Sequence, residues 1–164
     1  MAYFPMFVSL ENRACLIVGG GRVASRKCRG LLAFGAEVTM VAEWFAETKD
    51  GAMQEPGLNR IRRRVREADL AAQDWALVIA ATNDRQVNQQ VAAYCRKQGI
   101  PVNVADCREE CDFFFPAYCV EGAVVAGIGT SGISPKMASA IRKRLESALP
   151  EWIAELEKEG MENG

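Results

Sequence analysis

Short runs of apolar residues alternate with helical patterns over the first two thirds of the chain. Continuous apolar runs of this kind are typical of strands that are buried on both faces. Between them, apolar residues recur at the three- and four-residue spacing of amphipathic helices. The expected strands cover residues 14–18, 38–42, 75–82 and 101–106, and the expected helices cover residues 23–34 and 86–98. Strands and helices in this order predict an α/β fold with a Rossmann-like, doubly wound parallel sheet.

An arginine-rich stretch, RIRRRVR at residues 60–66, predicts one further strand. Strand alternation would put Arg60, Arg62, Arg64 and Arg66 on one face. Such a stripe could bind nucleic acid, or it could mark an edge strand whose charges prevent pairing with other chains. We favour the edge strand, because the formal net charge of the whole chain is only -1.

The alternation stops after the fifth expected strand. Two β-like runs around Glu121 and Gly122 predict a hairpin. Ser134 as N-cap and Pro135 at the first helical position predict the start of a helix. A separate, short last helix is expected over residues 151–159. The sheet is therefore expected to be followed by a small α+β segment and a short helical tail, with boundaries at 1–112, 113–149 and 150–164.

A glycine cluster, GGGRVA at residues 19–24, follows the first expected strand and opens the first helix. Gly19, Gly21 and Ala24 occupy the small positions of the pattern G-x-G-x-x-(G/A). In this context Gly19 would permit a tight turn, Gly21 would let backbone amides reach a diphosphate, and Ala24 would let the helix pack closely. The alternative is a structural turn without a ligand. We favour dinucleotide binding.

Polar residues follow two other expected strands. Glu43 stands about 20 positions beyond the glycines, where an acidic side chain would bind the adenosine ribose. No arginine follows it closely in the sequence, which favours NAD over NADP. Thr82 and Asn83 end the strand beside the switch point and could face the cofactor, although a helix N-cap by Asn83 or Asp84 explains them as well.

Composition excludes several classes of chemistry. The 164 residues include no histidine, so histidine-based catalysis and histidine metal sites are excluded. Six scattered cysteines are typical of reduced thiols in the cytoplasm. The spacing of Cys107, Cys111 and Cys119 matches no standard zinc site, so we expect no metal. The start of the chain lacks signal-peptide features, and no apolar run is long enough for a membrane span, so a cytoplasmic protein without nucleic-acid or membrane partners is expected.

The chain resembles the precorrin-2 dehydrogenase domain of siroheme synthases. The motifs that carry this resemblance are spread along nearly its whole length: FPMFVSLENRACLIVGGGRVASRK, VIAATNDRQVN, VNVAD, FFFPA and GTSGISPKMASAIRKRLESALP. The triple glycine with x-V-A-x-R-K, and S-P-x-x-A before an R-x-x-L-E helix, are the most characteristic. The resemblance implies oxidation of precorrin-2 to sirohydrochlorin in siroheme biosynthesis, with NAD as the hydride acceptor.

The resemblance also implies roles for particular residues. The catalytic carboxylate would be Asp106, at the end of the VNVAD motif. Residues 113–149 would form a dimerisation segment, making the protein a homodimer. The resemblance adds dinucleotide contacts from Arg22, Val23, Glu43 and Trp44. Together with the residues that the glycine pattern and the strand end predict, the candidate cofactor site comprises Gly19, Gly20, Gly21, Arg22, Val23, Ala24, Glu43, Trp44, Thr82 and Asn83.

The substrate of this family carries eight carboxylates, so its site should present cations and hydrogen-bond donors. Lys136 is the first cationic candidate, and Ser131 and Ser134 form a polar loop suited to carboxylates or to an opposing chain. For the basic residues at 142–144, a solvated helix face is an equal alternative.

Two other functions stay open from the sequence. Some relatives also insert iron into sirohydrochlorin, but many continue into a longer helical region that helps to enclose the substrate. Because this chain ends sooner, its ferrochelatase activity is in doubt. An NAD-sensing regulatory module is the third hypothesis, and the absence of an effector domain within 164 residues is against it.

Overall fold

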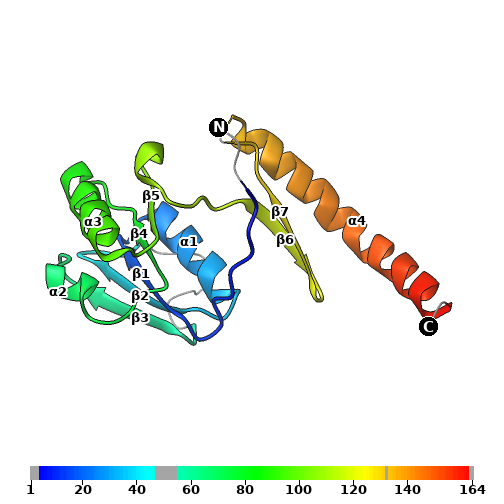
Figure 1. The fold of residues 1–164 in the computed structure, drawn as a ribbon, viewed down its shortest axis with the longest axis horizontal. Coiled ribbons are helices and arrows are strands. Elements are labelled where there is room, and N and C mark those ends of the chain that lie inside the picture. Colours follow the sequence, from blue (N-terminus) through cyan, green and yellow to red (C-terminus); the bar gives the residue numbers. More distant parts are fainter. Residues whose placement is uncertain (1–3, 47–54, 132, 163–164) are drawn as a thin grey trace. The chain divides into compact units, whose positions relative to one another are not determined.

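The computed structural model describes residues 4–46, 55–131 and 133–162. The chain divides into two compact units: Val8–Phe114, and Phe115–Gly164 together with Met1–Phe7. Figure 1 shows the alternating strands and helices of the first unit and the hairpin and long helix of the second.

Five parallel strands form the sheet of the first unit, in the order β3-β2-β1-β4-β5. They are β1 (Ala14–Val18), β2 (Glu37–Ala42), β3 (Leu58–Arg62), β4 (Leu77–Ala80) and β5 (Val102–Val104). The predicted parallel, doubly wound sheet is thus confirmed. Strand order reverses between β1 and β4, so their carboxyl ends form the switch point, where ligands bind in open α/β sheets.

Two long helices lead away from this switch point. α1 (Arg22–Leu32) connects β1 to β2, and α3 (Arg85–Gln98) connects β4 to β5. Because right-handed crossovers leave the switch point in opposite directions, the two helices cover opposite faces of the sheet. α3 ends at Gly99, whose left-handed backbone (φ +70°) favours glycine. Two short helices complete the unit, α2 (Glu67–Leu70) and the 3-10 helix η1 (Arg108–Glu110).

The main core lies between α3 and the sheet. Leu16 and Val78 from the central strands are fully buried there. They pack in one cluster with Val91 and Cys95 of α3 and with Trp75 before β4. Because α1 covers the opposite face of the sheet, the central strands β1 and β4 carry no polar residue on either face.

The arginine-rich stretch forms the edge strand β3, as predicted, but the strand ends at Arg62. The expected single face of four arginines is therefore wrong, since Arg64 and Arg66 lie beyond the strand. The chain turns because Arg63 binds Asp69 through two hydrogen bonds of 2.5 and 2.6 Å, and Asp69 also accepts the Arg66 amide. The hydrogen bond from Arg63 lowers the pKa of Asp69.

The second unit contains an antiparallel hairpin and one helix. β6 (Ala117–Glu121) and β7 (Val124–Ile128) pair around Gly122, as predicted. Helix α4 (Pro135–Glu162) begins where expected, and its first turn is capped by Ser134, whose Oγ accepts the Met137 amide at 3.1 Å.

The separate last helix expected over residues 151–159 is wrong, because α4 continues through Pro150 to Glu162. The reason lies in an apolar stripe at four-residue spacing, Ile141, Leu145, Leu149 and Ile153, which crosses the proline without a break. Leu149, directly before the proline, is buried. Among the described residues, no helix has the length and apolar character to cross a membrane.

A half-buried amine connects α1 to β5. Lys27 Nζ donates a hydrogen bond of 2.8 Å to Asn103 Oδ1, and the Asn103 amide donates in turn to the Phe113 carbonyl at 2.8 Å. Burial of this amine, with a smaller effect of Arg26, lowers the pKa of Lys27 to about 8. The hydrogen bonds thus fix the end of the first unit to α1, while burial disfavours the protonated amine.

The free energy of unfolding should depend on pH through the titration of Lys27. Unfolded, this lysine keeps its proton up to its ordinary pKa of 10.5, whereas the folded protein releases it near 8. Between these values the unfolded state binds more protons, so stability should rise with pH relative to the Lys27→Met variant. Urea unfolding of both proteins from about pH 7 to about pH 10 measures this difference. A difference that stays constant with pH would contradict it.

Candidate functional site

The loop after β1 requires glycine at its first position. Gly19 has φ +132°, a conformation that side chains disfavour, and a Cβ there would lie 2.2 Å from the Ala81 carbonyl oxygen. The Gly19 amide donates to the Val41 carbonyl at 2.9 Å. Gly19 therefore lets the end of β1 pack directly against the chain that leaves β4.

Gly20 is required by a second backbone contact. A Cβ at Gly20 would lie 1.9 Å from the Trp44 carbonyl oxygen, and the Ala46 amide donates to the Gly20 carbonyl at 2.7 Å. This contact anchors the segment after β2, which carries Glu43 and Trp44. The sequence pattern had left this role of the second glycine undetected, because G-x-G-x-x-(G/A) accepts any residue there.

Gly21 has no such packing reason. It is the N-cap of α1 with an ordinary φ of −75°, and no atom of the described residues lies within 4 Å of the position where its Cβ would stand. The space above the first turn of α1 is therefore open, and a glycine N-cap leaves the first amides of the helix uncapped by any side chain. Arg22 and Val23 are exposed beside this space, and Ala24 is buried against the sheet. The arrangement suits an anion such as a diphosphate.

Glu43 directly follows β2 and is exposed, as is Trp44 beside it. The structure adds a partner that the sequence did not suggest: Arg64 Nε donates to Glu43 Oε2 at 3.3 Å. Although no arginine follows Glu43 closely in the sequence, β3 pairs with β2 and brings Arg64 alongside it in space. Arg60 of the same strand lies over the Phe45 ring, 5.2 Å from its centre.

The segment after β4 is held by Asn88, a fully buried residue of α3. Asn88 Oδ1 accepts the Thr82 amide at 3.0 Å and the Thr82 hydroxyl at 2.7 Å, and the Asn88 amide donates to the Thr82 carbonyl at 3.1 Å. Asp84, rather than Asn83, caps α3 by accepting the Gln86 and Val87 amides. Thr82 is therefore committed to this network, while Asn83 is exposed.

Asn88 is not among the site residues predicted from the sequence. Its signal was a polar residue directly after Val87 on the apolar face of an amphipathic helix, where a buried amide needs partners.

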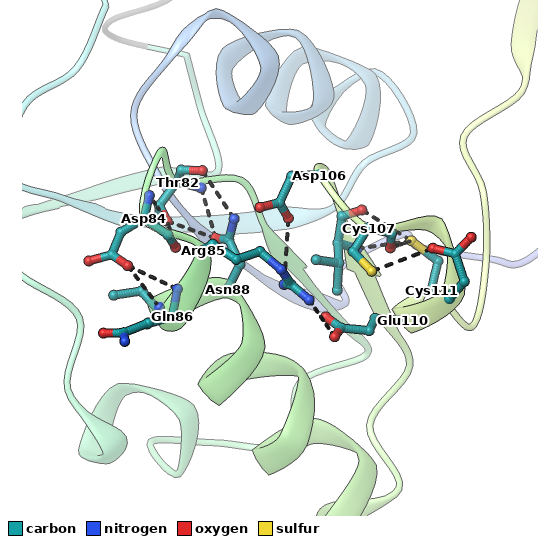
Figure 2. A network of polar contacts seen from close by, with 12 residues as sticks. Thr82, Asp84, Arg85, Gln86, Asn88, Asp106, Cys107, Glu110 and Cys111 are labelled. Carbon is teal, nitrogen blue, oxygen red and sulfur yellow. Dashed lines mark hydrogen bonds and ion pairs between the residues drawn. The ribbon is translucent and has the colours of Figure 1, made fainter.

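Asp106 stands two residues beyond β5, at the same edge of the sheet, with its side chain 38% exposed. Its Oδ1 lies 3.8 Å from Nη1 of Arg85, the first residue of α3. Figure 2 shows Arg85 between Asp106 and Glu110, whose carboxylate accepts its other nitrogen at 2.5 Å. This contact raises the pKa of Arg85 and lowers that of Glu110, so both groups are charged.

The cysteines beside Asp106 have a structural role. Cys111 Sγ accepts the Val104 amide at 3.1 Å and lies 3.3 Å from the Cys107 carbonyl oxygen, closing the turn around η1. Burial raises the pKa of the Cys111 thiol. All six cysteines are free thiols, and within the ranges described no group of three or more Cys, Asp or Glu side chains could hold a metal ion.

The remaining candidates belong to the second unit. Ser131 is exposed with φ +50°, and Lys136 is exposed in the first turn of α4. Ser134 uses its hydroxyl for the helix cap, and its carbonyl accepts the Thr130 hydroxyl at 3.1 Å. The first unit therefore brings together the glycine loop, Glu43, Asn83 and Asp106 along one sheet edge. Ser131, Ser134 and Lys136 belong to the loop before α4 and to its first turn.

A family model described as "Putative NAD(P)-binding" matches residues 6–117, which include the glycine loop, Glu43 and Asp106. The chain belongs to this NAD(P)-binding family. The residues present fit a dinucleotide, since Gly21 opens the space before uncapped helix amides and Glu43 is exposed at the end of the neighbouring strand.

Individual relatives agree with this family. The siroheme synthases of Methylococcus capsulatus and Nitrosomonas europaea are 45% and 39% identical, each over 92% of this chain. The chain spans about a third of the length of these curated relatives, 31% of each. A solved structure of SirC, precorrin-2 dehydrogenase, is 30% identical with a TM-score of 0.69, covering 88% of this chain and 70% of that one.

Alanine substitutions at neighbouring glycines should separate folding from cofactor binding. Gly20→Ala should lower the free energy of unfolding by about 2 kcal/mol or more, because its methyl group meets the Trp44 carbonyl. Gly21→Ala should stay within about 1 kcal/mol of wild type, since its Cβ meets no described atom. It should nevertheless weaken NAD⁺ binding roughly tenfold or more, about 1.4 kcal/mol, by filling the approach to the helix amides.

Urea unfolding and calorimetric titration with NAD⁺ measure the two effects. Gly21→Ala with unchanged NAD⁺ affinity would show that the dinucleotide binds elsewhere.

Proposed function

We propose that the chain is an NAD-dependent dehydrogenase that oxidises precorrin-2 to sirohydrochlorin in siroheme biosynthesis. The likeness to SirC over most of both chains and to the siroheme synthases supports this substrate. The observation that carries the proposal is the exposed carboxylate of Asp106 at the sheet edge that also bears the open helix start at Gly21.

The reaction removes a hydride and a proton from the macrocycle. When bound, NAD⁺ would supply the hydride acceptor, giving NADH. The first amides of α1 would hold its diphosphate and Glu43 its adenosine ribose, with Arg22, Val23 and Trp44 beside them. Glu43 favours NAD over NADP, because its carboxylate would repel a ribose 2′-phosphate, and the nearby Arg64 is paired with it.

Asp106 would accept the proton. The chain contains no histidine, so the bases available near neutral pH are carboxylates, amines and thiols. Cys111 is an unsuitable base because burial raises its pKa and its sulfur is engaged by the backbone. Asp106 is exposed and reaches beyond β5, at the end of the sheet where ligands bind.

Removing the carboxylate of Asp106 should greatly slow turnover without weakening the binding of NAD⁺. Asp106→Asn keeps the size of the side chain and should lower kcat by roughly 100-fold or more, the usual contribution of general base catalysis. Its affinity for NAD⁺ should stay within about twofold of wild type, because the base does not hold the dinucleotide. The assay follows the absorbance of sirohydrochlorin and NADH after mixing the protein with precorrin-2 and NAD⁺.

Glu109→Gln is the matched control, since it removes an exposed carboxylate from the same turn. Turnover by Asp106→Asn at the wild-type rate would eliminate Asp106 as the base. Absence of turnover by the wild-type protein would instead overturn the proposed reaction.

We further propose that the protein acts as a homodimer in the cytoplasm, joined through its second unit. Free thiols support the compartment. The dimer is supported by the exposed apolar residues of the hairpin and α4, because large exposed apolar patches on a folded protein mark interaction sites. They are Val120, Val124, Met137, Ile141, Trp152 and Leu156, and Ile133 in the loop before α4 is exposed as well.

A charge on the hairpin should separate the subunits. Val120 is 48% exposed and pairs across the hairpin with Val125, so Val120→Glu places a carboxylate on an apolar surface. Sedimentation equilibrium should give a dimer for wild type and for the control Glu121→Gln, and a monomer for Val120→Glu. A monomeric wild-type protein at micromolar concentration would refute the dimer.

A further inference from the structure

Arg85 is a fixed cation beside the proposed catalytic carboxylate. It is the first residue of α3, directly after the Asp84 cap. Its Nη2 donates to Glu110 Oε1 at 2.5 Å, and its Nη1 lies 3.8 Å from Asp106 Oδ1 (Figure 2). The first distance is a hydrogen bond and the second is longer than one. The guanidinium is therefore held by a hydrogen bond to Glu110 and forms only a longer ion pair with Asp106.

Glu110 serves as the anchor of this cation. Its side chain is only 16% exposed, and its Oε2 is buried without a hydrogen-bond partner among the described residues. The hydrogen bond from Arg85 lowers its pKa, so the carboxylate is ionised and keeps the guanidinium in place. Its position in η1 brings this anchor near Asp106, four residues earlier in the chain.

A contribution to stability does not account for the exposed part of the Arg85 side chain. Its side chain is 44% exposed and that of Asp106 is 38% exposed. Exposed ion pairs at such distances contribute little to stability. A ligand that approaches Asp106 would meet the Nη1 side of Arg85 at the same time.

We propose that Arg85 binds a carboxylate of the substrate and so holds the polyanionic macrocycle next to Asp106. This inference rests on the proposed function. A substrate with eight carboxylates is repelled by Asp106 alone, and a neighbouring guanidinium offsets that repulsion. Guanidinium also matches the planar geometry of a carboxylate, with two parallel N–H donors. The residue determines binding of the acidic macrocycle, and Asp106 performs the proton transfer.

The test uses a charge-balanced variant. Removing Arg85 alone would leave the Glu110 carboxylate uncompensated, so Arg85→Gln is combined with Glu110→Gln. The double variant should raise the KM for precorrin-2 roughly 10- to 100-fold, the loss expected for one hydrogen bond between charged groups. Its kcat should stay within about twofold of wild type, and raising the salt concentration should affect its KM less than that of wild type.

Lys97→Gln is the matched control, since it removes an exposed cation from the other end of α3. It should leave KM and kcat unchanged. A second variant, Glu110→Gln alone, keeps the guanidinium but frees it, and should raise KM by less than the double variant.

The alternative role for Arg85 is to position Asp106. In that case the double variant would lower kcat and leave KM unchanged, and this result would overturn the proposal. An unchanged kcat and KM would also overturn it.

Binding of sirohydrochlorin, followed by its fluorescence without NAD⁺, separates this inference from the proposed reaction. Weaker binding by the double variant supports the role of Arg85 even if wild type does not oxidise precorrin-2. Equal binding by both proteins contradicts it.

Discussion

The close approach of two backbone segments at Gly20 is the constraint on which the site depends. The Trp44 carbonyl occupies the volume that any side chain at position 20 would need, and the Ala46 amide hydrogen-bonds the same glycine. The Ala81 carbonyl stands in the same relation to Gly19. The loops that leave β1, β2 and β4 are therefore locked to one another. Only Gly21 remains for a ligand to approach.

Two arginines lie at the same edge of the sheet as these loops. Glu43 and Asp106 are the two carboxylates that we propose contact the ligands, and each faces an arginine within 4 Å. In both cases the arginine comes from a neighbouring strand or helix: Arg64 follows β3 and Arg85 starts α3. Exposed pairs of this kind add little to folding. We interpret them as groups that set how carboxylates meet a negatively charged cofactor and substrate.

Prediction from sequence succeeded where one periodic signal dominates. The apolar runs of β1, β2 and β4 indicated a parallel sheet because both of its faces are covered, and Gly99 ended its helix where a left-handed residue was required. It failed where local rules compete with packing. Pro150 suggested a helix end, but the apolar stripe through Leu149 kept α4 continuous. The arginines at residues 60–66 predicted a strand with four arginines on one face, but the strand ends at Arg62 and Arg63 binds Asp69 in the turn that follows.

The sequence by itself indicated the sheet, the glycine loop and the position of Glu43, because their signals are local: period, turn residues and distance along the chain. Asp106 was indicated by the family resemblance. Only the tertiary structure decided which glycine is open to a ligand, that Asn88 holds the segment after β4, and that Arg64 and Arg85 stand beside the carboxylates. The arginine contacts join residues that are far apart in the chain, 21 positions for Glu43 and Arg64 and 25 positions for Arg85 and Glu110. Such contacts leave no periodic trace, since strand order and crossover direction alone bring the partners together.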